Sequence, residues 1–205
     1  MAPRFNKTSA WPVWALLCLA PQAHAARVLS VAVHRQGSVF LIGMRLRVAA
    51  PPAAVFRALQ DYAALPRYTA DVRSVRTVPL GQPGRVLLFT IVHSCVLFFC
   101  KTMHLEQRMT AMPDAHGGVL RSVLLTPGSD FREGRGRWTV RACNTRRAHS
   151  CLEVRIRLVP DFWVPPLIGP WLIRRSLREQ ARLAAAGLQR LAQRPGRRPA
   201  PEQRH

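Results

Sequence analysis

Acidic residues are scarce in this chain: Asp and Glu number 10 against 31 Lys and Arg, which gives a formal net charge of +21 over 205 residues. Lysine is almost absent too, since only Lys7 and Lys101 occur and the other basic side chains are arginines. Arginine, alanine and proline are abundant together, a pattern that genome composition also produces, so the charge alone favours an anionic partner only weakly. Hydrophobic residues make up 48% of the chain, which excludes general disorder.

Several chemistries lack their characteristic residues. The histidines show no metal-ligand spacing, and no Cys-x-x-Cys pair occurs. Gly128, Gly134 and Gly136 lie within β-rich sequence and form no phosphate-binding loop, and no Ser-His-Asp arrangement can be argued. The expected strands lack the interleaved exposed aromatic residues on which nucleic-acid bases stack. The sequence therefore predicts no metal, no cofactor and no nucleic-acid partner.

The first 25 residues follow a three-part pattern. Arg4 and Lys7 precede a short apolar run over 11–20, and residues 23–25 read Ala-His-Ala. A charged start, an apolar middle and a small-residue cleavage site are typical of a secretory signal, and the run is too short to span a bilayer comfortably. We predict that residues 1–25 are a signal peptide and that the protein is exported, to the periplasm in the simplest case. An uncleaved anchor is the alternative.

Hydrophobic periodicity predicts one domain of mixed elements. One helix opens at Pro51-Pro52 and ends at Pro66, and a second, amphipathic helix runs from 167 or 171 to 192. The expected strands cover 43–49, 70–78, 85–94, 99–110, 119–126, 131–143 and 151–159. The predicted organisation is a signal peptide over 1–25, an N-terminal lead-in over 26–42, the folded domain over 43–192 and a disordered basic tail over 193–205.

Four cysteines remain after the signal, in a compartment where disulfides form, and three pairings are open. If Cys95 pairs with Cys100, Val92 faces Met103, and apolar and polar side chains separate onto opposite faces of the hairpin. A one-residue slip would mix the two faces. If Cys143 pairs with Cys151, Trp138 faces Ile156 with the same separation. We therefore predict the disulfides Cys95–Cys100 and Cys143–Cys151, with free buried thiols as the alternative.

The two hairpin registers define an inward face that is largely apolar. These four strands contribute no carboxylate and no histidine to it, although Gln107 lies on it and Ser94 and Lys101 lie near one rim. General acid–base catalysis needs a titratable group within reach of the substrate, so this face favours binding over catalysis. A packed core without a cavity is the alternative. With three residues of the C-terminal helix, the expected ligand-cavity residues are Thr90, Val92, Met103, Leu105, Trp138, Val140, Val154, Ile156, Ile173, Leu177 and Ala184.

Four segments carry a resemblance to a known superfamily. They are Ala49-Ala-Pro-Pro-Ala-Ala-Val-Phe56, Asp61-Tyr-Ala-Ala-Leu-Pro-Arg-Tyr68, Gly134-Arg-Gly-Arg-Trp138 and residues 160–177. Their order resembles the START-like (SRPBCC) superfamily, in the branch that groups polyketide cyclase-like proteins with the coenzyme Q-binding Coq10 type. The resemblance implies an α+β helix-grip fold, in which a curved antiparallel sheet wraps around a long C-terminal helix. It also implies an apolar cavity for lipids, quinones, sterols or polyketides.

The function expected from these features is binding of a hydrophobic small molecule, a lipid or an isoprenoid quinone, between the sheet and the C-terminal helix. The molecule would be sequestered or transferred without covalent change. A polyketide cyclase- or aromatase-like enzyme is one alternative, and an envelope adaptor with a filled core is another. The basic helix suggests transient contact with an anionic membrane, although a solvated helix face explains it too. The candidate membrane-contact residues are Trp163, Trp171, Arg174, Arg175 and Arg178.

Overall fold

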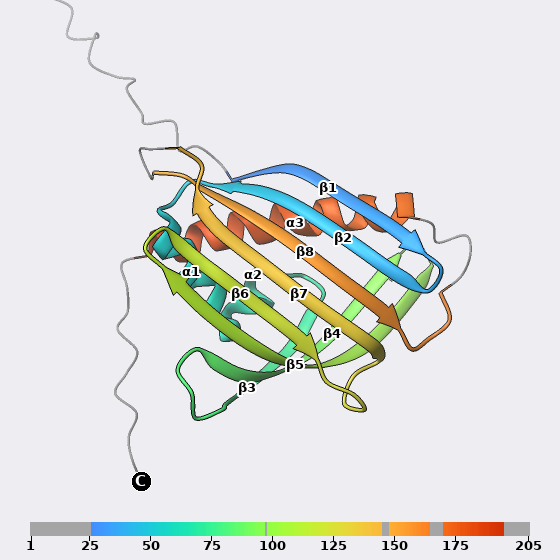
Figure 1. Cartoon of the computed structure of the whole chain (residues 1–205). Helices are drawn as coiled ribbons and strands as arrows, with labels where there is room; N and C mark the ends of the chain where they lie inside the picture. The colour runs from blue at the N-terminus through green and yellow to red at the C-terminus, as the bar shows by residue number, and fades with distance from the viewer. Residues whose placement is uncertain (1–25, 97, 145–147, 165–169, 195–205) are drawn as a thin grey trace, which may run out of the picture.

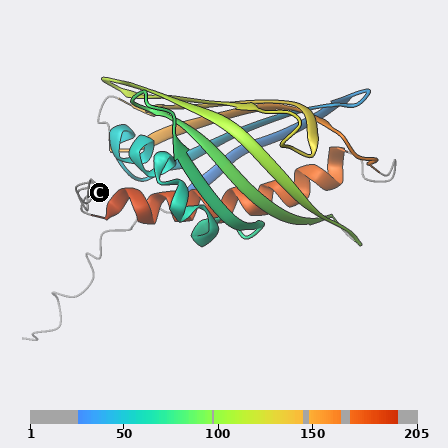
Figure 2. The same cartoon turned by 90° about the horizontal axis from the view of Figure 1, so that it is seen from below.

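The computed structural model describes residues 26–96, 98–144, 148–164 and 170–194, so the predicted signal peptide lies outside the described residues, as does the predicted basic tail from residue 195 on. Gln193, predicted to begin that tail, is instead the last residue of the C-terminal helix. One antiparallel sheet has the strand order β1-β2-β8-β7-β6-β5-β4-β3. It is curved and arches over a long helix, α3 (Figures 1 and 2). The strands are β1 Arg27–Gln36, β2 Val39–Val48, β3 Val72–Pro79, β4 Arg85–Val96, β5 Phe99–Asp114, β6 Gly117–Leu124, β7 Phe131–Ala142 and β8 Ser150–Pro160. The helical elements are α1 Pro52–Gln60, η1 Tyr62–Ala64, α2 Leu65–Tyr68 and α3 Pro170–Gln193. The predicted helix-grip fold is confirmed.

The sheet begins earlier in the chain than the periodicity predicts. Residues 27–42, interpreted above as a lead-in, form β1 and the first part of β2. A register shift between Val28 and Ser30 interrupts the alternation of β1, so its pattern is not visible in the sequence. β2 pairs with β8 along its whole length, and α3 packs against β1 and β2. The hairpin is therefore part of the fold that holds the C-terminal helix.

The first helix ends before the residue predicted. Asp61 has φ −78° and ψ 72°, outside the helical region, so α1 stops at Gln60. The chain continues through η1 into α2, and Pro66 lies in the first turn of α2, where its missing N–H is tolerated. This interruption leaves Tyr62 and Tyr68 buried beneath the sheet.

The β4–β5 hairpin has the predicted register, with Cys95 opposite Cys100 and Val92 opposite Met103. The Cys95–Cys100 disulfide joins Cα atoms 4.0 Å apart.

The β7–β8 hairpin differs from its prediction by two residues, because Trp138 lies opposite Val154 rather than Ile156. The backbone N–H of Cys143 donates a hydrogen bond to the His149 carbonyl, 3.0 Å away, so the Cys143–Cys151 disulfide joins diagonal positions. The predicted register assumed that the two cysteines face each other directly, and in the structure they do not. A two-residue shift preserves the alternation of a strand, so the predicted inward face of this hairpin is kept.

The core is most tightly packed where α1 and the C-terminal half of α3 meet the sheet. Val48, Val55 and Val140 are fully buried there, and Leu152 and Val154 are nearly so. Two hydrogen bonds hold this end together: Ser150 Oγ donates to the Ala50 carbonyl at 2.6 Å, and Gln193 Nε2 donates to the Ala49 carbonyl at 2.9 Å. No helix within the described ranges has both the length and the apolarity that crossing a bilayer requires.

Candidate functional site

An apolar cavity of about 330 Å³ lies between the concave face of the sheet and the segment formed by η1 and α2. Its sheet wall includes Leu88 and Leu105 from the paired strands β4 and β5, and its helical wall includes Leu59 and Leu65. We call this space the inner cavity. Its volume lies at the lower end of the range of about 300–1,000 Å³ that is usual for ligand pockets. No carboxylate and no imidazole occurs among the described residues that line it.

A second, smaller pocket of about 180 Å³ lies where α3 begins, and we call it the outer pocket. Phe131, Phe162 and Ile173 contribute to its apolar lining. Lys101 stands at its side, with Nζ 4.6 Å from the centre of the Phe162 ring. Leu158 lines both spaces. The two spaces therefore adjoin.

The inner cavity contains a buried polar atom without a partner. Thr90 is 6% exposed, and its Oγ1 makes no hydrogen bond to any described residue. An unpaired buried hydroxyl costs free energy of folding. A ligand that offers a carbonyl or hydroxyl at this point would satisfy it.

Both tyrosines of the chain, Tyr62 and Tyr68, line the inner cavity. Burial raises the pKa of Tyr62 to about 12. The pKa of Tyr68 is raised still further, mainly by burial and then by the negative charges of Asp61 and ionised Tyr62. Both phenols are therefore protonated at neutral pH, and each can donate a hydrogen bond to a ligand.

Two glycines make room for aromatic side chains of the cavity. A Cβ at Gly136 of β7 would lie 2.5 Å from the Trp138 ring and 2.6 Å from Ser122 Oγ. A Cβ at Gly187 of α3 would overlap the Tyr68 side chain and approach its Cγ to 2.7 Å. Glycine at these positions lets the indole and the phenol lie directly against the backbone.

The family model described as "polyketide cyclase / dehydrase and lipid transport" matches residues 48–185, which is most of the fold described above. The chain belongs to this family. Strands β3 to β8, the η1–α2 wall and most of α3 fall inside the matched region, so both cavities are built largely from family residues. No curated protein matches the chain significantly.

Solved structures show the same fold at low sequence identity. An aromatase/cyclase, Zhui from Streptomyces sp. R1128, is 14% identical over 76% of this chain and 94% of its own, with a TM-score of 0.59. Human STARD10 is 9% identical over 79% of this chain and 72% of its own, with a TM-score of 0.57. A START superfamily protein from Mycobacterium smegmatis is 14% identical over 74% of this chain and 98% of its own, with a TM-score of 0.53. The resemblance to the START-like superfamily inferred from the motifs is confirmed.

The predicted cavity residues lie in three different parts of the structure. Thr90, Val92, Leu105, Trp138 and Ile156 line the inner cavity, and Met103 and Ile173 line the outer pocket. Val140 and Val154 lie in the packed core, and Leu177 and Ala184 pack against that core, so these four line neither space. The η1–α2 segment, rather than α3, closes the inner cavity. The prediction missed this wall because the unbroken helix expected up to Pro66 hid the turn after Asp61.

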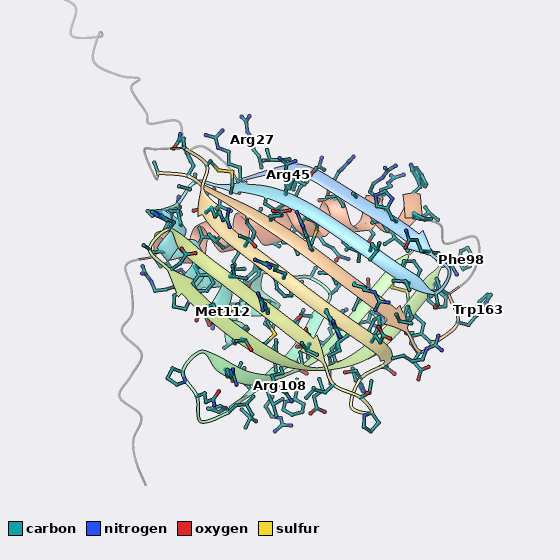
Figure 3. All side chains as sticks on the ribbon, in the orientation of Figure 1. Arg27, Arg45, Phe98, Arg108, Met112 and Trp163 are labelled. Atoms are coloured by element: carbon teal, nitrogen blue, oxygen red, sulfur yellow. A yellow bond between two sulfur atoms is a disulfide. The ribbon has the colours of Figure 1, made fainter. Side chains whose placement is uncertain are left out.

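The predicted membrane-contact residues are exposed around the beginning of α3. Trp163 is 72% exposed and Trp171 is 59% exposed, and the three arginines Arg174, Arg175 and Arg178 are exposed as well. Phe98, at the turn between β4 and β5, is 83% exposed and lies with Trp163 at one end of the molecule (Figure 3). Their chain neighbours Phe99 and Phe162 line the outer pocket. This exposed aromatic end is therefore continuous with the outer pocket.

Proposed function

We propose that this family member is an exported domain that binds one hydrophobic small molecule, a lipid or an isoprenoid quinone, and carries it without covalent change. The inner cavity would hold the molecule, and the outer pocket would lie on its route in and out. The observation that carries the proposal is the apolar inner cavity with the buried, unpaired hydroxyl of Thr90 inside it. Apolar contact would supply most of the affinity, and Thr90, Tyr62 and Tyr68 would orient a polar head.

A polyketide cyclase-like enzyme is the alternative function. The fold shared with an aromatase/cyclase is compatible with it, and two phenols that stay protonated at neutral pH could polarise a substrate carbonyl. The described lining offers no carboxylate or imidazole that could remove a proton at neutral pH. Non-covalent binding is therefore the function we favour.

Export and membrane contact belong to the same proposal. Disulfides persist in oxidising compartments, and the pairs Cys95–Cys100 and Cys143–Cys151 support export. Phe98 is exposed beside the outer pocket. This exposure supports the proposal that the aromatic end collects the ligand at a membrane. The intact mass of the exported protein tests the signal: a chain beginning after residue 25 is expected, and one still beginning at Met1 would contradict the prediction.

The decisive experiment identifies what the protein carries. The protein is purified from the envelope of an expressing bacterium without detergent, examined by native mass spectrometry, and then extracted with organic solvent. We expect one apolar molecule per chain. Val92→Phe should block binding, because Val92 lines the inner cavity and lies opposite Met103 of the outer pocket. Ile91→Phe is the matched control, since Ile91 is the next residue of the same strand, is 37% exposed and points to the opposite face.

Three results would decide against the proposal. Protein without ligand that also fails to bind added quinone and fatty-acid analogues would indicate a filled core and an adaptor role. Equal loss of binding in both variants would mean that the ligand does not occupy the inner cavity. Turnover of a polyketide-type substrate that Val92→Phe abolishes would favour the cyclase.

A further inference from the structure

The convex face of the sheet carries arginines that face one another across its central strands. Arg155 of β8 lies opposite Arg137 of β7, and Arg137 lies opposite Arg121 of β6. All three side chains are exposed. Directly opposite residues of an antiparallel pair have Cβ atoms about 4.5–5.5 Å apart, and like charges there repel each other. This repulsion opposes folding, so stability does not account for the arrangement.

Most of this positive charge is not neutralised within the described part of the chain. Glu153 forms an ion pair with Arg155 at 2.6 Å, and Glu133 forms one with Arg157. No described carboxylate forms an ion pair with Arg121 or Arg137.

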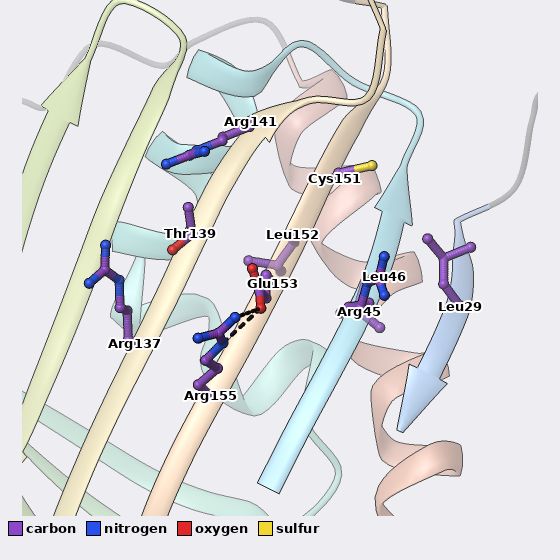
Figure 4. A pocket seen from close by; sticks show the side chains of 10 residues that line it. All are labelled: Leu29, Arg45, Leu46, Arg137, Thr139, Arg141, Cys151, Leu152, Glu153 and Arg155. Carbon is purple, nitrogen blue, oxygen red and sulfur yellow. Dashed lines mark hydrogen bonds and ion pairs between the residues drawn. The ribbon is translucent and has the colours of Figure 1, made fainter. Parts of the chain in front are cut away.

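Arg45 and Arg141 extend the group on the same face and likewise have no described ion-pair partner. Four of the arginines surround Glu153 at a surface hollow of about 460 Å³, where Glu153 forms its ion pair with Arg155 (Figure 4). We call the whole group the arginine crown: Arg45, Arg121, Arg137, Arg141 and Arg155.

The position of the crown suits contact with a flat surface. β8, β7 and β6 are the third, fourth and fifth strands in an order of eight, and the sheet arches away from α3 (Figure 2). A plane that approaches the convex side therefore meets these strands first. The aromatic end marked by Phe98 and Trp163 lies to one side of them (Figure 3), so the crown and the aromatic end are separate surfaces.

The chemistry of the crown indicates which partner it fits. A protein interface has a core that is poor in charge and rich in apolar and aromatic residues, whereas this face has five arginines and Glu153 at its centre. Single-stranded nucleic acid needs exposed aromatic side chains for stacking, and the crown contains none. The planar guanidinium group is suited to bidentate contact with phosphate. We propose that the arginine crown docks the protein on an anionic phospholipid bilayer, through a surface separate from the ligand cavity.

Vesicle flotation of the full exported protein tests this docking. The double variant Arg121→Gln/Arg137→Gln removes two charges from the crown. Arg57→Gln/Arg67→Gln removes the same charge from α1 and α2, beneath the sheet, and is the matched control. One arginine near an anionic bilayer strengthens binding roughly fivefold. We expect the crown variant to bind phosphatidylglycerol vesicles roughly 25-fold more weakly than the parent, and the control to stay within about twofold of the parent.

The same assay can overturn the proposal. Binding of the parent to phosphatidylcholine vesicles as strong as to phosphatidylglycerol vesicles would contradict it, as would equal weakening in both double variants. Crown-dependent binding of a double-stranded oligonucleotide, without crown-dependent binding of vesicles, would assign the surface to nucleic acid instead. Thermal unfolding confirms that each variant is folded, which we expect because the crown substitutions remove like-charge repulsion. A parent protein that binds no vesicles but still carries a ligand would contradict this inference without contradicting the proposed function.

Discussion

Replacing Thr90 with valine should change stability and ligand affinity in opposite directions. Thr90 lies in the inner cavity, is 6% exposed, and has an unpaired Oγ1. Burial of a hydroxyl without a hydrogen bond costs about 1–3 kcal/mol in protein mutational data. Valine has nearly the same shape and no polar atom, so Thr90→Val should stabilise the ligand-free protein by an amount of that order. A domain of this size gains about 2–4 °C in melting temperature per kcal/mol.

The ligand-bound protein should respond in the other direction. If Thr90 Oγ1 bonds the polar head of the ligand, its loss removes a net contribution of about 0.5–1.5 kcal/mol, or a roughly 2- to 12-fold loss of affinity. Affinity can be measured with a short-chain ubiquinone analogue that quenches Trp138, which lines the same cavity. Melting temperature is measured on the same samples, after extraction of any bound ligand.

Two further variants separate the hydroxyl from other effects. Thr90→Ser keeps the hydroxyl and removes a methyl group, so it should lose stability and keep affinity. Thr110→Val places the same substitution on the convex face, opposite Arg85 and Arg121, and measures what valine gains from strand propensity alone. A Thr90→Val protein that melts no higher than Thr110→Val and binds the analogue as tightly as the parent would refute the assignment of Thr90 as the polar contact.

Three other predictions concern the same fold. In the folded protein the pKa of Tyr62 is about 12, and the pKa of Tyr68 is also raised. The unfolded chain therefore loses these two protons at lower pH than the folded protein does. The free energy of unfolding that these tyrosines contribute should be fully present below about pH 10 and should fall as the pH rises toward 12. Absorbance titration of tyrosinate, which reports these two residues alone, checks this, and ordinary titration near pH 10 would contradict it. Gly187→Ala should destabilise by about 1–3 kcal/mol through overlap with Tyr68, less the roughly 1 kcal/mol that alanine gains in a helix; a higher melting temperature would disprove the close approach. Cys95→Ser/Cys100→Ser should cost about 2 kcal/mol, as expected for a short closed loop, and peptide mapping that recovers crossed disulfides would overturn the pairing.

The face that each residue presents within a hairpin was readable from the sequence, because strand alternation is a local property. The β4–β5 register followed from it, since a one-residue slip would place Met103 and Leu105 on the wrong face. The β7–β8 register did not follow, because a two-residue shift keeps Trp138 inward and leaves every face unchanged. The strand pairing, with Trp138 opposite Val154, and the hydrogen bond from Cys143 to His149 show which of the two registers forms. The Cys143–Cys151 disulfide is compatible with both, since cysteines at diagonal positions can also be joined.

Only part of the cavity could be predicted from the sequence, because its walls come from segments that are distant in the sequence. Strand periodicity placed Thr90 and Trp138 on the inward face, but it could not show that Val140, on the same face, would be covered by packed side chains. The turn at Asp61 creates the cavity wall that carries Tyr62, and no local sequence pattern predicted that turn.

For Gly187 too, the sequence and the tertiary structure give different information. Within the sequence it is a weak point in an amphipathic helix, and within the structure it is the place where Tyr68 meets the helix backbone. The sequence likewise showed an excess of arginine. The registers of two successive hairpins, β6–β7 and β7–β8, place Arg121, Arg137 and Arg155 side by side, and alternation alone did not fix those registers. Alternation along a strand depends on the residues of that strand alone, whereas lateral neighbours and cavity walls depend on how the whole sheet closes over its helices.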